Sequence, residues 1–221
     1  VLAKQLGWII SDNPYNVCGG YYRELPIPYT PNPRAKSQSD NYNIISDQSE
    51  WTLKGDMTFT GHVRVTQANR EMKADSVHVV RNDKKRVVSL DAAGHLRFIA
   101  PELLAIAKVG DFNLIKQVAK LKDVLYRAAP HAKRMRVVNP RTGKVEYRIY
   151  QLNAHGKAKE VDQVAPHIYT FSDASYTACP PTSNTWKVTA KKLKLDYTQG
   201  WGNAKNAWLY LKGVPVLYFP Y

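Results

Sequence analysis

The sequence lacks the features that mark membrane-spanning helices and most enzyme classes. No stretch approaches about 18 uninterrupted apolar residues, which excludes a transmembrane helix. Residues 1–7 contain no charged segment followed by an apolar one, so we expect any export signal to have been removed already. There is no glycine-rich phosphate loop and no nucleophile elbow. Acidic residues are also scarce: 18 Asp and Glu stand against 32 Lys and Arg, giving a net charge of +14.

Histidine is too scattered to suggest a metal centre. The six histidines never occur at metal-ligand spacing from one another or from a cysteine. His62, His78 and His95 alternate with apolar neighbours and are expected to face solvent from strands. Asp75 and Asp91 are expected at the surface rather than as a catalytic pair. We therefore predict that the protein is not an enzyme and has no cofactor or metal.

Two cysteines, Cys18 and Cys179, lie in turn-like contexts beside glycines or prolines. A disulfide between them would close a very long loop and contribute about 5 kcal/mol on the chain-entropy model. Each cysteine could instead pair with a partner elsewhere in a longer chain, or both could be free thiols in a reducing compartment. Their accessible contexts argue against free structural thiols and leave the other two alternatives open.

The basic excess peaks in residues 101–150, which carry 11 basic and 4 acidic side chains. Such an excess favours either an anionic partner or a solvated basic surface. No zinc-finger spacing, basic heptad pattern or aromatic ribonucleoprotein motif accompanies it. We therefore predict no nucleic-acid partner.

Prolines and then a period-two pattern divide the chain into an arm and a β domain. Five prolines fall within residues 14–33, and each removes a backbone donor. Residues 1–43 are therefore predicted to form an extended, proline-rich arm. Apolar and polar residues then alternate in short runs such as 57–60, separated by turn residues. This pattern predicts an all-β antiparallel sandwich or jelly roll over residues 44–221.

A short motif within this domain occurs twice. Glycine, histidine, an apolar residue, arginine and a second apolar residue follow one another from Gly61 and again from Gly94. Repetition of this kind builds a sheet from similar strand pairs.

Residues 117–128 break the period-two pattern. Apolar side chains recur there at spacings of three and four, which predicts a short amphipathic helix ended by Pro130. Its lysines suit either an anionic membrane surface or simple packing on the domain with the charges in water. We expect this helix to belong to an insertion at about residues 110–150. Residues 139–165 are expected to be loop around a short strand near 145–152.

Several motifs at both ends and in the middle of the chain form a specific combination. They are LGW at 6–8, NVCGGYY at 16–22, PIPY at 26–29, ISDQSE at 45–50, GHVRVTQ at 61–67, MKAD at 72–75, YTACP at 176–180 and VPVLYFPY at 214–221. The combination resembles the LptD family of outer-membrane proteins for lipopolysaccharide (LPS) assembly, in particular its N-terminal, OstA-type periplasmic domain. The segment at about residues 110–150 lies outside this resemblance.

The resemblance implies a fold, a function and partners. The family domain is a twisted antiparallel jelly roll, open along one seam, at the periplasmic face of the outer membrane. It accepts LPS from a periplasmic bridge protein of the same fold through edge-strand pairing and passes the acyl chains toward a C-terminal β-barrel. The implied partners are LPS, the bridge protein, the barrel and its plug lipoprotein. By the same resemblance, Cys18 and Cys179 form disulfides with barrel cysteines beyond Tyr221.

The expected lipid-binding residues are the apolar side chains of one strand face. Acyl chains need such a face because leaving them in water costs about 25 cal/mol per Å². Alternation assigns to the inside Met57, Phe59, Val63, Val65, Met72, Ala74, Val77, Val79, Leu96, Phe98, Leu104, Ile106, Phe112, Leu114, Tyr169, Phe171, Tyr176, Val188, Ala190, Leu193, Leu195, Leu209 and Leu211. A free-standing bridge protein of the same fold is the alternative, against which the arm and the two cysteines argue.

Overall fold

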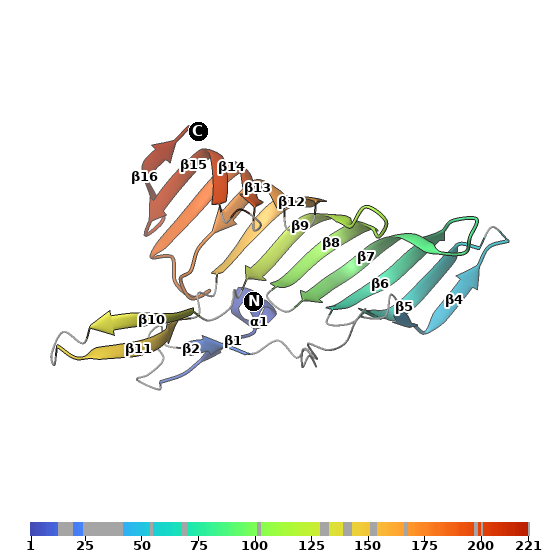
Figure 1. The fold of residues 1–221 in the computed structure, drawn as a ribbon, viewed down its shortest axis with the longest axis horizontal. Helices are drawn as coiled ribbons and strands as arrows, with labels where there is room; N and C mark the ends of the chain where they lie inside the picture. The colour runs from blue at the N-terminus through green and yellow to red at the C-terminus, as the bar shows by residue number, and fades with distance from the viewer. Residues whose placement is uncertain are drawn as a thin grey trace.

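Antiparallel strands make up nearly all of the protein, as a computed structural model shows (Figure 1). The structure describes residues 1–12, 20–23, 42–53, 55–67, 70–100, 103–128, 133–138, 143–150, 154–165, 168–196, 199 and 201–220. The elements are α1 (Leu2–Leu6), β1 (Trp8–Ile10), β2 (Gly20–Tyr22), β3 (Asn43–Ile45), β4 (Gln48–Trp51), β5 (Met57–Gln67), β6 (Arg70–Arg81), β7 (Val87–Ala100), β8 (Leu103–Asn113), β9 (Val118–Ala128), β10 (Lys133–Val138), β11 (Val145–Tyr150), β12 (Ala154–Ala165), β13 (Ile168–Tyr176), β14 (Trp186–Asp196), β15 (Trp201–Leu211) and β16 (Val214–Phe219). Within these residues, the helical structure is too short to cross a membrane.

One twelve-stranded antiparallel sheet forms the body of the molecule. Its order is β16-β15-β14-β13-β12-β9-β8-β7-β6-β5-β3, and β4 also pairs with β5. Most neighbours in the sheet are also neighbours in sequence, so the sheet is largely a meander. Two small sheets, β1-β2 and β10-β11, stand apart from it. The predicted all-β antiparallel fold is confirmed.

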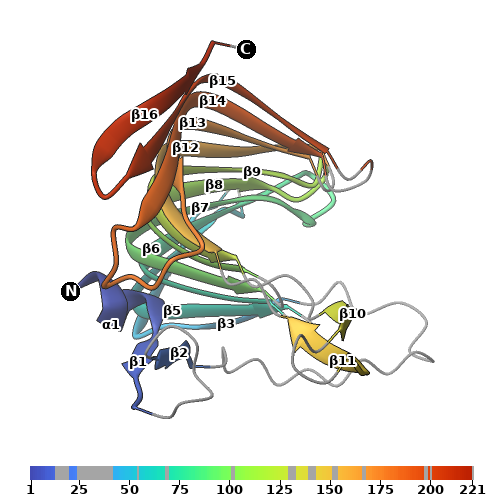
Figure 2. The same cartoon turned by 90° about the vertical axis from the view of Figure 1, so that its left-hand side faces the viewer.

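The sheet is folded across its strands into two halves that face each other (Figure 2). Phe98 of β7 lies opposite Ala105 of β8, and Phe112 follows seven residues later on β8. In a straight strand those seven residues would span about 23 Å. The rings of Phe98 and Phe112 are nevertheless 5.9 Å apart. The strands therefore bend near their middle, and the result is a jelly roll that is open along one seam.

A row of residues with left-handed backbone crosses the sheet where the strands bend; we call this row the crease. Every second long strand contributes a non-glycine residue with φ between 43° and 53°. They are His62 on β5, His95 on β7, Asp123 on β9, Asp173 on β13 and Asn206 on β15. The register also shifts beside His62 and His95, as at a β-bulge. Such irregularities bend a strand and increase its local twist.

Ion pairs between a basic and an acidic side chain link neighbouring segments along the outer side of the crease. They are His62–Asp47 at 2.7 Å, His95–Asp75 at 2.8 Å, Lys108–Asp123 at 3.1 Å and Lys191–Asp173 at 3.0 Å. The hydrogen bond to Asp47 raises the pKa of His62. All these side chains are substantially exposed, so we expect a modest contribution to stability from each pair.

The repeated glycine-histidine motif forms the crease in β5 and β7. Gly61 and Gly94 both have a φ of 75°, which favours glycine. A Cβ added to Gly94 would lie 2.8 Å from Cβ and Cγ of Asp75, so a side chain there would clash. Because Gly94 has no Cβ, the Asp75 carboxylate can approach closely enough to form a hydrogen bond with His95, the residue after Gly94.

A small N-terminal unit, made of α1, β1 and β2, covers part of the outer face of the sheet. Nη1 of the buried Arg127 donates hydrogen bonds to the backbone oxygens of Leu6 (3.3 Å) and Arg23 (2.9 Å). Its guanidinium lies 4.3 Å from the centroid of the Tyr22 ring. The Tyr22 hydroxyl is in turn 3.0 Å from Nδ1 of His155. The first 43 residues thus include a helical turn and a paired strand, and are not wholly extended.

Two predictions of local structure are wrong. Residues 118–128 of the expected helix form strand β9, and residues 154–165 of the expected loop form strand β12. In β9, Leu121 and Val124 both belong to the buried core because the left-handed Asp123 shifts the two-residue period by one position. The resulting spacing of three imitates a helical pattern. The expected helix in the insertion is therefore absent, and the strands β10 and β11 form a hairpin there.

Gly94→Ala should destabilise the protein by about 3 kcal/mol or more, since a left-handed φ costs an L-residue about 1–2 kcal/mol and the clash with Asp75 adds to it. Gly55→Ala is the matched control, because Gly55 has a φ of 94° but nothing within 4 Å of an added Cβ. Gly55→Ala should therefore lose only the stability that the left-handed φ costs, about 1–2 kcal/mol. Urea denaturation followed by circular dichroism measures both losses, and equal losses would contradict the close packing of Asp75.

His155→Gln should make stability less sensitive to acid. Burial lowers the pKa of His155 below its ordinary value of 6.5. As the pH falls below 6.5, the unfolded chain therefore binds a proton at His155 before the folded chain does. Wild type then loses stability, by at most about 1.4 kcal/mol per pH unit, and above pH 6.5 the effect disappears. Thermal unfolding at pH 7.5 and 5.0 compares the two proteins; identical pH dependence would contradict the burial of a neutral imidazole.

Candidate functional site

Apolar side chains from the long strands line the inner face of the folded sheet and make it the candidate site. The most buried of them, none more than 7% exposed, are Met57, Val63, Val65, Met72, Ala74, Val77, Val79, Leu90, Ala92, Leu96, Ala105, Ala107, Leu121, Val124 and Tyr126. They belong to β5–β9, where the two halves of the sheet pack against each other. At this end the inner face is a closed hydrophobic core.

The inner face becomes more exposed towards the other end of the sheet. Phe171 of β13 contacts Tyr126 at a ring distance of 5.7 Å and pairs in register with Leu193 of β14. Both Phe171 and Leu193 are only half-buried, and Tyr176 is 39% exposed. An apolar surface that begins as a packed core thus continues as a partly solvated lining over β13–β15.

Small side chains lie beside the crease over these same strands. Each of β12, β13, β14 and β15 places an alanine at the crease, on the inner face. These alanines, which are 4–6% exposed, are Ala158, Ala174, Ala190 and Ala207. Because alanine fills little volume, these strands place little side-chain bulk on the inner face beside the crease.

Most residues that alternation assigned to the inside lie on this face. Nearly fully buried are Met57, Val63, Val65, Met72, Ala74, Val77, Val79, Leu96 and Ala190. Half-buried are Phe59, Phe98, Phe112, Leu114, Tyr169, Phe171, Val188, Leu193, Leu195 and Leu209. Tyr176 and Leu211 are exposed at 39% and 46%. These positions bring together side chains from seven strands, and their contact with lipid stays a prediction.

Leu104 and Ile106 lie on the outer face, so their inward assignment is wrong. Ala105 between them belongs to the inner cluster and pairs with Tyr126. Leu104 pairs instead with Arg127, the residue that binds the N-terminal unit, and is fully buried. Because this unit covers the outer face here, apolar residues occupy both faces of β8 and their alternation does not distinguish inside from outside.

Sequence reasoning also missed several inner residues. They are Leu90, Ala92, Ala105, Ala107, Leu121, Val124, Tyr126 and Val161. Three of them lie in β9, which its spacing made look helical. Leu90 and Ala92 do alternate with polar neighbours, so the period-two signal was present but unused.

The pKa of Tyr169, on the inner face of β13, is shifted by burial and by a distant charge of β6. Burial raises the pKa of the Tyr169 hydroxyl, and the positive charge of Arg70 partly offsets this effect. Arg70 begins β6 and Tyr169 lies near the start of β13, in the far part of the sheet. The half-buried Tyr169 of the inner face therefore experiences the positive charge of Arg70.

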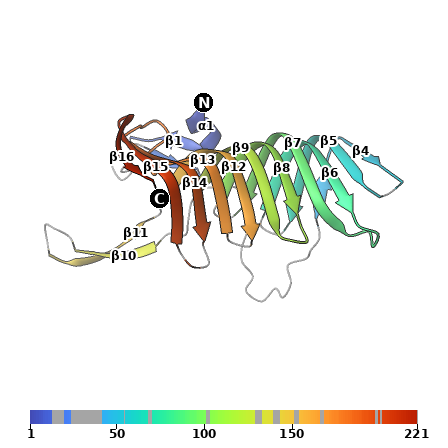
Figure 3. The same cartoon turned by 90° about the horizontal axis from the view of Figure 1, so that it is seen from above.

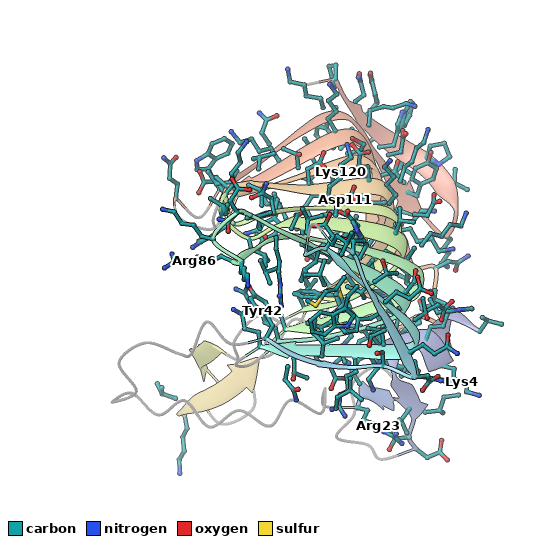
Figure 4. All side chains as sticks on the ribbon, turned by 90° about the vertical axis from the view of Figure 1, so that its right-hand side faces the viewer. Lys4, Arg23, Tyr42, Arg86, Asp111 and Lys120 are labelled. Atoms are coloured by element: carbon teal, nitrogen blue, oxygen red, sulfur yellow. The ribbon has the colours of Figure 1, made fainter. Side chains whose placement is uncertain are left out.

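The outer face is polar around Asp111 and Lys120, and no catalytic or metal-binding arrangement is found among the described residues. Asp111 and Lys120 pair in register beside a surface pocket of about 540 Å³ (Figure 4). Lys120 lies 2.8 Å from Glu160 and 3.7 Å from Asp162, and the hydrogen bond to Glu160 raises its pKa. Across the described ranges, no three His, Cys, Asp or Glu side chains are placed to hold a metal ion.

One predicted disulfide residue is described. Cys179 is 9% exposed and is not in a disulfide, and its backbone N–H donates a 3.0 Å hydrogen bond to Oγ1 of Thr177. Cys18 lies outside the described residues. The pairing of the two cysteines with partners elsewhere stays a prediction.

Comparison with known proteins gives consistent matches. Residues 43–201 match the family model described as LptA/(LptD N-terminal domain) LPS transport protein. The chain is 29% identical over 220 residues to LPS-assembly protein LptD of Legionella pneumophila (strain Paris), covering 99% of this chain and 24% of that protein. It is 30% identical over 206 residues to LptD of Hahella chejuensis, covering 92% and 23%. It is 28% identical over 196 residues to LptD of Acinetobacter baylyi, covering 88% and 21%.

The chain therefore spans less than a quarter of the length of these curated relatives. Among solved structures, it is similar to LptH, described as the LptA homologous periplasmic component of the lipopolysaccharide transport device from Pseudomonas aeruginosa. That match covers 76% of this chain and 84% of LptH, with 12% identity and a TM-score of 0.30.

Leu121→Ala and Leu125→Ala should differ in stability, because a strand with a crease at Asp123 places the two side chains on opposite faces. Leu121 is 7% exposed in the inner cluster, so its truncation should cost about 2–5 kcal/mol. Leu125 is half-buried on the outer face and should cost less than half as much. Urea denaturation measures both losses. Equal losses would instead fit a helix, in which residues four apart share a face.

Proposed function

The chain belongs to the LptA/(LptD N-terminal domain) family of LPS transport proteins, and on that premise we propose that it carries LPS along the inner face of its sheet. The observation that supports this most is the continuity of the inner face, from a packed core at β5–β9 to half-exposed strands at β13–β15. The family model describes a transport protein rather than an enzyme.

The apolar lining replaces the water-excluding environment that acyl chains leave behind in a membrane. Each Å² of acyl surface kept from water is worth about 25 cal/mol. Phe171, Leu193 and Leu195 would supply such contacts on neighbouring strands, and the small alanines beside the crease would leave room for acyl chains. Movement along the face exchanges one apolar contact for another, so the domain itself needs no energy source.

The phosphorylated sugars of LPS stay outside the seam in this proposal. The positive charge of Arg70, which acts on the Tyr169 hydroxyl, would favour a phosphate group beside the inner face. The basic outer surface, with a net charge of +14 over the chain, favours the same orientation.

The free edges of the sheet suit strand pairing with further domains. At one edge Ile45, Trp51 and Leu53 are 57%, 70% and 109% exposed, beside the short strands β3 and β4. At the other edge every residue of β16 is exposed. Exposed edges of this kind are templates for additional strands. We propose that a bridge protein of the same fold joins the β3–β4 edge.

The remaining parts of the proposal concern a longer chain. Strand β16 would lead into a C-terminal β-barrel with its plug lipoprotein, and the domain would lie at the periplasmic face of the outer membrane. Residues 1–43 would act as an arm attached to the jelly roll of 44–221. Cys18 and Cys179 would then form disulfides with cysteines of the barrel.

Photo-crosslinking tests whether LPS contacts the inner face of the sheet. A photoreactive amino acid at Phe171 or Leu193, both half-buried on the inner face over β13–β14, should give ultraviolet-dependent adducts with LPS. The same amino acid at the outward, exposed Arg64 or Lys73 should give few or none. Immunoblotting for LPS on the purified protein measures the adducts. Capture at Arg64 and Lys73 without capture at the inner positions would contradict the proposal.

A further inference from the structure

A pocket on the outer face of the sheet has no role in the proposed function. It lies where α1 comes next to β9, β12 and β13 (Figure 3). Leu2 of α1, Leu125 of β9 and Gly213 in the turn after β15 are among its lining residues, and its volume is about 280 Å³. Because ligand pockets usually begin at about 300 Å³, this volume suits one small ligand and not a whole lipid.

The pocket opens where β12 and β13 separate from each other. Their regular pairing stops at Glu160 and Ser172. Beyond that point the Ser175 hydroxyl replaces a backbone partner, because it accepts a 3.0 Å hydrogen bond from the backbone N–H of Lys157. Gly156 also has no Cβ, and a Cβ there would overlap the backbone oxygen of Ser175. Particular residues therefore maintain the gap between the two strands.

Two polar lining residues are more than nine-tenths buried. His155 is 5% exposed and Thr177 is 8% exposed, and they form an isolated backbone bridge between the strands. Oγ1 of Thr177 donates a 2.7 Å hydrogen bond to the backbone oxygen of Trp186. Within the described part of the chain, the His155 ring bonds only the Tyr22 hydroxyl, at Nδ1 and 3.0 Å. A neutral imidazole that accepts this bond carries its proton on Nε2, which is then a donor for a ligand.

Positive charge surrounds the pocket. Lys157 and Lys187 line it, and both are exposed. Arg127, which is 4% exposed, pairs in register with His155. Among the described residues, none of these three cations forms an ion pair with a carboxylate, and no Asp or Glu lines the pocket. Because a buried cation without a counter-charge is costly, an anion in the pocket would be favoured.

Hydroxyl, amide and aromatic groups complete the lining. Ser175, Ser183 and Asn184 can donate and accept hydrogen bonds, as sugar hydroxyls require. Tyr210 pairs in register with Lys187, whose ammonium lies 5.3 Å from the centroid of the Tyr210 ring. A tyrosine offers an apolar ring and a polar tip to the same ligand. These groups suit a sugar that carries an anionic substituent.

We propose that this pocket binds a single sugar that carries a phosphate group. A phosphate presents several charged oxygens, so the two lysines and Nε2 of His155 can each donate to a different one. The sugar ring then uses the hydroxyl and amide groups and Tyr210. The site itself does not depend on the proposed function. Its assignment to the phosphorylated saccharide of LPS rests on that function, and a free sugar phosphate has the same chemistry.

Nuclear magnetic resonance titration tests the site with lipid-free probes. Glucose 6-phosphate added to the isotope-labelled 221-residue chain should shift the ring resonances of His155 and raise the pKa of His155, because a phosphate stabilises the protonated ring. Glucose and inorganic phosphate should each bind about tenfold more weakly, because each lacks part of the contacts. Inorganic phosphate of equal affinity would contradict the sugar, and tighter binding of glucuronate would contradict the phosphate.

Two lysines of β14 provide a matched pair of variants. Lys187→Gln should raise the Kd for glucose 6-phosphate about tenfold, as for the loss of one hydrogen bond to a charged group. Lys194→Gln should bind like wild type, because Lys194 is equally exposed and lies 5.7 Å from the Trp201 ring but does not line the pocket. Thermal unfolding verifies that both variants are folded. No binding by wild type, or equal losses in the two variants, would overturn the proposal.

The phosphorylated oligosaccharide released from LPS by mild acid distinguishes the two sources of the sugar. Tighter binding than that of glucose 6-phosphate, lost in Lys187→Gln, would support the assignment to LPS. Weaker binding would overturn this assignment and point to a free sugar phosphate. These probes have no acyl chains, whereas the photo-crosslinking at Phe171 and Leu193 uses intact LPS. Failure of the pocket and failure of the proposed function therefore give different results.

Discussion

The left-handed residues of the crease are the constraint on which the rest of the structure depends. A flat sheet of this length would expose both faces, and its apolar side chains would have no partner layer. Five non-glycine residues with positive φ, together with Gly61 and Gly94, bend the strands so that one sheet encloses its own inner face. A positive φ is unfavourable for an L-residue, and it persists because the two halves then bury a common core. The ion pairs outside the crease lie where the strands bend.

The inner face beside the crease is tightly packed over one part of the sheet and more exposed over the other. Over β5–β9, side chains such as Leu96, Phe98 and Tyr126 meet between the two halves and form a packed core. Over β12–β15, the inner residues beside the crease are buried alanines, and the larger inner side chains further along β13–β15 are only half-buried. One continuous surface can therefore both stabilise the fold and present apolar area to a ligand. The edges at β3–β4 and β16 leave this surface open to extension at either end.

The sequence allowed much of the fold to be predicted, and its failures have physical causes. Alternation identified most strands and inner residues because each half of a bent strand keeps its own two-residue period. It failed in β9, where the left-handed Asp123 shifts the period and imitates a helix. It failed at Leu104, where the N-terminal unit covers the outer face and both sides of the strand are apolar. The glycine-histidine motif was visible, but its meaning as a crease depends on strand register.

The central claim, that the inner face carries lipid, is tested most directly by the accessibility of adjacent positions on β13. A nitroxide attached through an unnatural amino acid at Phe171 reports on the inner face, and one at Ser172 reports on the outer face. Electron paramagnetic resonance with a water-soluble nickel relaxation agent should show that LPS lowers accessibility at residue 171 and leaves residue 172 unchanged. A decrease confined to residue 172, or no change at residue 171 at saturating LPS, would contradict the account.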